Sequence, residues 1–183
     1  MLLQATERAE AGDFAQAAEL SQQLLAQDET NTSALFLLSR SLTMLGRNND
    51  AIKALEKAVK SQPDDIDVFN LLGHLLYHSG RHEDAMDAFN RCLELKPDHV
   101  EAMRQMANLM LGSDQANALH LFKRAYALAP DHGDLLFDYA WAMTYSVGDT
   151  DMGANLFRRW LELGRGTADR GSIALQALNY ASN

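Results

Sequence analysis

The sequence of 183 residues predicts an all-α protein, built as a solenoid of stacked helix–turn–helix repeats. The prolines are the first observation, because the only three, Pro63, Pro97 and Pro130, are spaced by 34 and then by 33 along the chain. Strong helix formers such as Ala, Leu, Gln, Glu and Met dominate, and no stretch alternates polar and apolar residues as a strand does. A repeat of about 34 residues is typical of helix–turn–helix solenoids.

Other residue types recur with the same spacing of 33 or 34. The alanine column is Ala17, Ala51, Ala85 and Ala118, and the glycine column is Gly12, Gly46 and Gly80. An apolar column contains Met1, Leu35, Phe69, Met103 and Leu136. Columns of different chemistry that share one spacing indicate that a structural unit is repeated.

The first helix of each unit is clearest after residue 65. Phe69, Leu72 and Leu76 recur at helical spacing and define a buried face. Gly73 lies on that face, and its small size lets a neighbouring helix approach closely. Gly80 is placed to end the helix, because glycine adopts the left-handed C-cap conformation at little cost.

The second helix of the same unit carries Ala85, Phe89 and Cys92 at i, i+4 and i+7. We expect Ala85 to lie where the two helices cross. Pro97 stops the second helix and directs the chain into the next unit. Two short helices cannot bury these faces alone, so neighbouring units must stack.

These residues resemble the tetratricopeptide repeat motif. The resemblance rests on Phe69 to Gly73, Gly80, Ala85, Phe89 and Pro97, and on Leu35, Leu38, Gly46, Ala51, Ala58 and Pro63 one repeat earlier. It covers nearly the whole chain. It implies a right-handed superhelix whose concave surface is lined mainly by the first helix of each unit.

We predict one domain over residues 1–183. Its parts are a partial repeat at 1–31, full repeats at 32–65, 66–99 and 100–132, a divergent repeat at 133–165 and a capping helix at 167–181. The fourth unit is one residue short, at its turn Gly112 to Asp114. The fifth has Gly153 or Ala154 at the crossing position, Trp160 in a column of small residues, and Arg165 near the expected proline.

Composition excludes several classes of function. The net charge is -9 and no basic stripe is present, which disfavours binding to nucleic acid. A single cysteine, Cys92, allows no internal disulfide. No apolar run approaches the ~20 residues of a membrane span and no signal peptide is recognisable, so we predict no membrane insertion and a cytoplasmic location.

The resemblance also predicts where a ligand binds. Residues off the buried face of each first helix point into the concave groove. The predicted peptide-binding residues are Phe36, Arg40, Asn70, His74, Tyr77, Arg104, Asn108, Phe137, Trp141 and Tyr145. Five of these are aromatic, and we expect them to be exposed, since large rigid side chains dominate binding energies. The alternatives are packing against the cap helix or the next unit, and self-association.

Some members of the family hold the carboxylates at a peptide's C-terminus with a Lys/Asn/Arg clamp. Arg104 and Asn108 have the i, i+4 spacing of such a clamp. The next unit supplies Asp138 and Trp141, where neutral or basic groups would help. The clamp is incomplete, which disfavours a ligand with an anionic tail.

No residue pattern predicts catalysis, a metal or a cofactor. His74 and His78 share a helix face, but two histidines without a third ligand are a frequent coincidence. His99 and His132 both follow Pro-Asp at unit junctions, which makes them part of the repeated turn. Cys92 shares a column with alanines and is explained as a small buried thiol.

We therefore expect a non-catalytic scaffold that binds a protein or peptide ligand in its groove. One alternative is the substrate-recognition region of a larger bacterial glycosyltransferase or sulfotransferase, since 172–180 is similar to the join before the catalytic region of O-GlcNAc-transferase-like proteins. The column Leu37, Leu71, Gln105 and Asp138 lacks the asparagines of those enzymes. A further alternative is a homo-oligomer, formed through the solenoid ends or through Trp160 with Tyr180.

Overall fold

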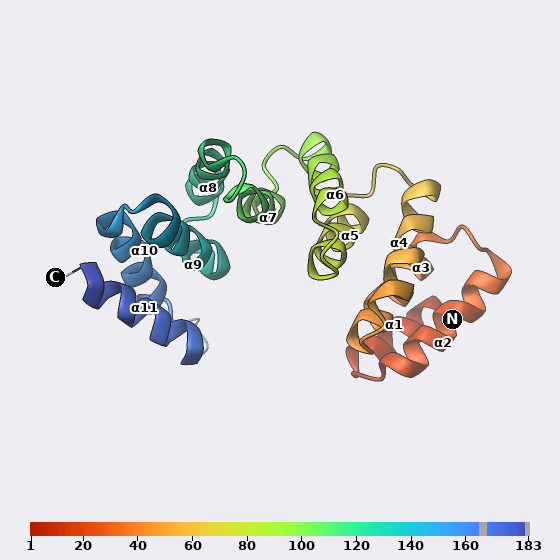
Figure 1. Cartoon of the computed structure of the whole chain (residues 1–183). Helices are drawn as coiled ribbons and strands as arrows, with labels where there is room; N and C mark the ends of the chain where they lie inside the picture. The colour runs from red at the N-terminus through yellow and green to blue at the C-terminus, as the bar shows by residue number, and fades with distance from the viewer. Residues whose placement is uncertain (165–167, 182–183) are drawn as a thin grey trace. The chain divides into compact units, whose positions relative to one another are not determined.

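A computed structural model describes residues 1–164 and 168–181, and these residues form helices that pack in consecutive pairs (Figure 1). The chain divides into two compact units, Met1–Lys96 and Pro97–Asn183. The prediction of an all-α repeat fold is confirmed. Arg165 and Thr167, at the end of the predicted fifth repeat and the start of the predicted cap, lie outside the described residues.

The first unit contains six helices joined by short turns. They are α1 (Leu2–Glu10), α2 (Phe14–Gln27), α3 (Thr32–Met44), α4 (Asn48–Ser61), α5 (Ile66–His78) and α6 (His82–Leu95). Each even-numbered helix packs on the helix before it, and α3 also packs on α2 and α5 on α4. The odd-numbered helices therefore form one row and the even-numbered helices a second.

The second unit continues the same pairing. It contains α7 (Val100–Met110), α8 (Gln115–Leu128), α9 (Gly133–Trp141), the π-helical segment η1 (Ala142–Val147), α10 (Thr150–Glu162) and α11 (Ala168–Ala181). The last helix packs on α10 and buries Ala174 and Ala177.

Repeated caps set the helix starts. Asn31 and Asp65 accept hydrogen bonds from backbone N–H groups of the first turn through side-chain oxygens, and His99 and His132 do so through Nδ1. These four residues recur with the spacing of the repeat, so both histidines belong to the repeated turn, as predicted. Such caps satisfy donors that a helix start leaves without an internal partner.

The glycine column ends the helices. Gly80 has φ +75°, its N–H binds the carbonyl of Tyr77 at 3.0 Å, and the N–H of Arg81 binds the carbonyl of Leu76 at 2.9 Å. This pair of bonds is a Schellman motif, and Gly46 makes the same pair one repeat earlier. The positive φ explains why glycine recurs at these positions.

The alanine column lies at the helix crossings. Ala17, Ala51, Ala85 and Ala118 are all fully buried. Gly73 marks a second close approach, since a Cβ on it would lie 2.7 Å from Cε1 of Phe89. The expectation that small residues sit at tight crossings is confirmed.

The fourth and fifth repeats, at 100–132 and 133–165, depart from the pattern in opposite directions. Helix α7 has 11 residues where α3 and α5 have 13, and the turn after it contains no glycine with positive φ. In the fifth repeat, the stretch from the capping residue His132 to Gly148 is one residue longer than the stretch from Asp65 to Gly80 in the third repeat. The π-helical segment η1 accommodates this extra residue.

The close contacts of Gly153 identify the residue at the helix crossing of the fifth repeat. A Cβ on Gly153 would lie 2.0 Å from Oγ1 of Thr144 and 3.1 Å from the carbonyl oxygen of Ala140. Gly153, rather than Ala154, is therefore the residue at the crossing of η1 and α10.

Candidate functional site

In the first unit, Phe36 and Arg40 lie on α3 beside two hollows. One, of about 230 Å³, is lined by Phe36, Arg40, residues of α1 and the acidic start of α5. The other, of about 340 Å³, lies on the far side of Arg40 and is lined by residues of α1, α2, α3 and α5, among them Phe14 and Met44. Arg40 is exposed and makes no ion pair with any described residue.

The predicted residues on α5 are more covered than expected. Tyr77 is half-buried, and its ring lies against the rings of His78 and His82, with centroids 5.3 and 5.5 Å away. His74 is half-buried with its ring edge-on to Phe89. Asn70 is also half-buried, and its Oδ1 is buried without a hydrogen-bond partner among the described residues.

In the second unit, Arg104 is buried inside a charged network. Its Nη2 and Nε bind the two carboxylate oxygens of Glu101 at 2.6 and 2.9 Å, and its Nη1 binds Oδ2 of Asp138. Asn108 donates to the same Asp138 oxygen at 2.8 Å. Burial lowers the pKa of Arg104, but the hydrogen bonds and charges of Glu101 and Asp138 outweigh it, so this pKa is raised.

This network explains why Arg104 and Asn108 do not form an open clamp. Both side chains already hold an internal carboxylate, that of Asp138. Two carboxylates surround one guanidinium, which leaves a net negative charge that opposes an anionic ligand.

The expectation that Phe137 is exposed is wrong. It is 7% exposed, and its ring packs on Phe157 and Trp160 at centroid distances of 5.5 and 5.1 Å. The guanidinium of Arg170, on α11, lies 4.8 Å from the same ring centroid. Residues of α10 and α11 therefore cover this part of α9, as in the packing alternative.

Trp141 and Tyr145 do form an exposed aromatic pair. They are 42% and 50% exposed, and their ring centroids lie 5.3 Å apart. Asp138, Trp141 and Tyr145 follow one another at i, i+3 and i+7, so they share one face of α9 and η1. The pair therefore lies along the helix from the Arg104 network.

The idea that Trp160 mediates self-association is wrong. Trp160 is 1% exposed and packs inside the second unit against Phe137. The side chain of Tyr180, its suggested partner, lies outside the described part of the structure.

The remaining candidate for chemistry, Cys92, belongs to the core. Cys92 is fully buried, with Sγ 3.6 Å from the carbonyl oxygen of Ile66, and burial together with the charge of Asp67 raises the pKa of its thiol to about 12. Within residues 1–164 and 168–181, no three His, Cys, Asp or Glu side chains are grouped to hold a metal ion. No helix in these ranges is long and apolar enough to cross a bilayer.

The sequence contains a signal for the Arg104 network that the clamp interpretation misses. Asp138 lies on the next first helix, in the column directly after that of Arg104, because the repeat spacing here is 33. Opposite charges in adjacent columns of consecutive first helices can pair across those helices. A comparison of charges in adjacent columns could therefore have predicted this ion pair.

Paired helices with recurring caps, glycine turns and alanine crossings define a helix–turn–helix repeat protein. Profiles described as tetratricopeptide repeat match residues 8–75 and 66–99. The chain belongs to the tetratricopeptide repeat family.

Several solved structures show the same fold. The chain is similar to MamA, with 20% identity and a TM-score of 0.77 over 87% of this chain and 94% of MamA. It is similar to YrrB, with 18% identity and a TM-score of 0.75 over 94% of this chain and 87% of YrrB. PilF of Pseudomonas aeruginosa is 16% identical, with a TM-score of 0.81 over 98% of this chain and 86% of PilF. Comparison with curated protein sequences gives no significant match.

Proposed function

We propose that this chain is a non-catalytic interaction scaffold that binds a peptide segment of a partner protein on the faces of its odd-numbered helices. The exposed pair of Trp141 and Tyr145 carries this proposal. Two large rings in contact with each other and half open to solvent offer rigid apolar area, and such residues dominate binding energies at protein interfaces. A structural neighbour, YrrB, is described as a tetratricopeptide repeat protein with an unusual peptide-binding site.

Two further features, one in each unit, support a peptide as the ligand. The Arg104 network fixes Asp138 on the same helix face, which provides a polar, acidic flank beside the rings. In the first unit, Arg40 lines two hollows that also contain apolar side chains. It makes no ion pair with any described residue. Apolar anchors with a few polar groups are the usual composition of a peptide-binding surface.

Selection of a displayed random-peptide library on the immobilised protein tests this function. We expect selected peptides to lose about tenfold or more in affinity for Trp141→Ala and for Tyr145→Ala, because interface aromatics contribute about 1.4 kcal/mol or more. Leu128→Ala is the matched control, since Leu128 is a large apolar residue that is 53% exposed on α8.

The chain also contains an internal reporter. Of its two tryptophans, Trp141 is exposed and Trp160 is buried. A bound peptide should shift the emission of Trp141, and Trp141→Phe should remove that shift. Equal losses for Leu128→Ala and Trp141→Ala, or peptides that bind without any change in emission, would contradict the proposed surface.

A further inference from the structure

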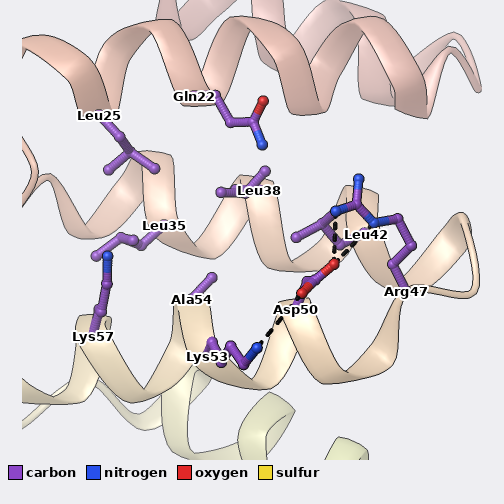
Figure 2. Close-up of a pocket in the computed structure, with 10 residues that line it drawn as sticks. All are labelled: Gln22, Leu25, Leu35, Leu38, Leu42, Arg47, Asp50, Lys53, Ala54 and Lys57. Carbon is purple, nitrogen blue, oxygen red and sulfur yellow. Dashed lines mark hydrogen bonds and ion pairs between the residues drawn. The ribbon is translucent and has the colours of Figure 1, made fainter.

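The first unit has an apolar groove on the opposite edge of α3, away from the surface proposed above. It lies between α2 and α4 and has a volume of about 310 Å³ (Figure 2). Leu35, Leu38 and Leu42 of α3 form its floor, with Leu25 of α2 and Ala54 of α4 at the sides. Its rim is polar and consists of Gln22, Arg47, Asp50, Lys53 and Lys57.

The same groove recurs one repeat later. Its floor is Phe69, Leu72 and Leu76, the counterparts of the three leucines, and it has a volume of about 390 Å³. Its rim is Glu56, Arg81, Asp84, Asp87 and Arg91, which are the counterparts of the rim residues of the first groove. A recurring hollow is a consequence of the repeat, so any difference in function must come from the rims.

In the second groove, acidic residues neutralise the rim. Arg81 pairs with Asp84 at 2.7 Å and reaches Glu56, on α4, at 3.6 Å. Arg91 pairs with Glu94 at 2.8 Å and with Asp64 at 3.0 Å. Both cations of this rim are therefore matched by carboxylates, and Asp87 adds a further negative charge.

In the first groove, all of those carboxylates except the counterpart of Asp84 are missing. Gln22 stands where the second groove has Glu56, so Arg47 pairs only with Asp50, at 2.6 Å. Lys53 stands where the second groove has Asp87, and its Nζ is 3.9 Å from Asp50. Figure 2 shows both of these pairs converging on the single carboxylate of Asp50.

Lys57 differs most from its counterparts. Arg91, Arg124 and Arg159, in the same column, each reach back to the linker before their own repeat, at Asp64, the carbonyl of Pro97 and Asp131. Lys57 has Thr30 and Lys60 where Arg91 has Asp64 and Glu94. It is exposed and makes no ion pair with any described residue.

The first groove thus has three cations and one carboxylate around an apolar floor, in a chain whose net charge is -9. We propose that it binds an acidic peptide segment of a partner, with an apolar side chain on the leucine floor and carboxylates against Lys53, Lys57 and Arg47. Complementary charge supplies the selectivity, because the second groove offers the same floor behind an acidic rim that repels such a ligand.

The probe for this site is a fluorescein-labelled synthetic peptide with leucines on one helical face and glutamates on the other. We expect saturable binding by fluorescence anisotropy that weakens as salt is raised, because the rim charges are exposed and screened. A peptide with serines in place of the leucines should bind more weakly, since it cannot fill the apolar floor.

Variants that reverse or reduce the positive charge of the rim locate the binding. Lys53→Asp with Lys57→Glu should weaken binding roughly tenfold, because two exposed charge pairs with the peptide are replaced by repulsion. Gln22→Glu should also weaken binding, since it gives Arg47 the carboxylate that Arg81 has. All three side chains are at the surface, and circular dichroism melting confirms that each variant folds.

The control has the same change in net charge at two residues that do not line the groove. Lys96→Glu with Lys123→Asp should leave the affinity within about twofold, because long-range charge effects are screened. Equal loss in the control and the groove variant, unchanged affinity in the groove variant, or no saturable binding to the wild-type protein would overturn the proposal. Since the groove belongs to the first unit and Trp141 to the second, and the two tests use different variants, failure here is distinct from failure of the proposed function.

Discussion

Gly153 packs directly on Thr144 where α10 crosses η1, with 2.0 Å between Oγ1 of Thr144 and the position that a Cβ on Gly153 would occupy. The carbonyl oxygen of Ala140 closes the same space at 3.1 Å. Glycine is therefore required here for close approach, although it weakens a helix interior by roughly 0.5–1 kcal/mol relative to alanine.

We expect Gly153→Ala to lower the free energy of unfolding by about 1–3 kcal/mol, because overpacking a tight crossing outweighs the gain in helix propensity. Urea denaturation followed by circular dichroism measures the change. Gly171→Ala is the matched control in α11, where a Cβ would meet no atom within 4 Å, and it should stabilise the protein slightly. Equal behaviour of the two variants would mean that the crossing is not as tight as described.

The Arg104 network leads to a second prediction. Arg104→Ala should cost about 3 kcal/mol or more of stability, since it leaves Glu101 and Asp138 facing each other at low exposure without a cation. The double variant Arg104→Met with Asp138→Leu should recover part of that loss, because it removes one of the two carboxylates that are left without a cation. A double variant less stable than Arg104→Ala alone would show that the network is needed for packing as a whole.

The sequence alone predicted the repeat because each repeated column has a local cause. Glycine is needed for a positive φ at the turn, as at Gly80, and alanine for a close crossing, as at Ala85. These requirements are met within one repeat or between adjacent helices. Spacing along the chain was therefore enough to find them.

The candidate site was predicted less well because groove exposure depends on neighbouring repeats. Phe137 has the helical position of a groove residue, but Trp160 and Arg170 cover it. Arg104 is predicted to face a ligand, and Asp138, on the next first helix, neutralises it instead. Trp141 and Tyr145 are exposed because no described side chain covers them in this way. Repeat spacing alone does not show which groove residues a neighbouring helix covers.

Cys92 gives a prediction about reactivity and pH. Its thiol should react slowly with a disulfide reagent at pH 8 in the folded protein and rapidly in urea, since it is fully buried and its pKa is raised to about 12. The folded state holds this proton more tightly than the unfolded state, whose ordinary value is near 9. Its contribution to stability is therefore complete below pH 9 and is lost as the pH rises toward 12.

The matched variant is Cys92→Ala, because Ala58 and Ala125 fill the same column and are fully buried. It should fold and should show a smaller fall in the free energy of unfolding between pH 9 and 12 than the wild-type protein. Rapid labelling of the folded protein at pH 8 would contradict the burial of the thiol.

The last prediction concerns the fit between Gly73 and Phe89, whose ring atoms lie 2.7 to 2.9 Å from the position of a Cβ on Gly73. The preceding repeat has Ser39 and Leu55 at the same two positions, both fully buried. A larger residue on the first helix is thus combined with a smaller one on the second. Gly73→Ser should destabilise the protein by about 1–3 kcal/mol through overpacking, and Phe89→Leu should destabilise it by leaving a cavity.

The double variant, which copies the preceding repeat, should be more stable than the sum of the single effects predicts. Residues in direct contact show coupling energies of about 0.5–3 kcal/mol, and here the smaller side chain makes room for the larger one. Free energies of unfolding from urea denaturation of all four proteins complete the cycle. Additive effects would mean that the two side chains do not compete for the same space, and the recurrence of paired sizes across repeats would then need another cause.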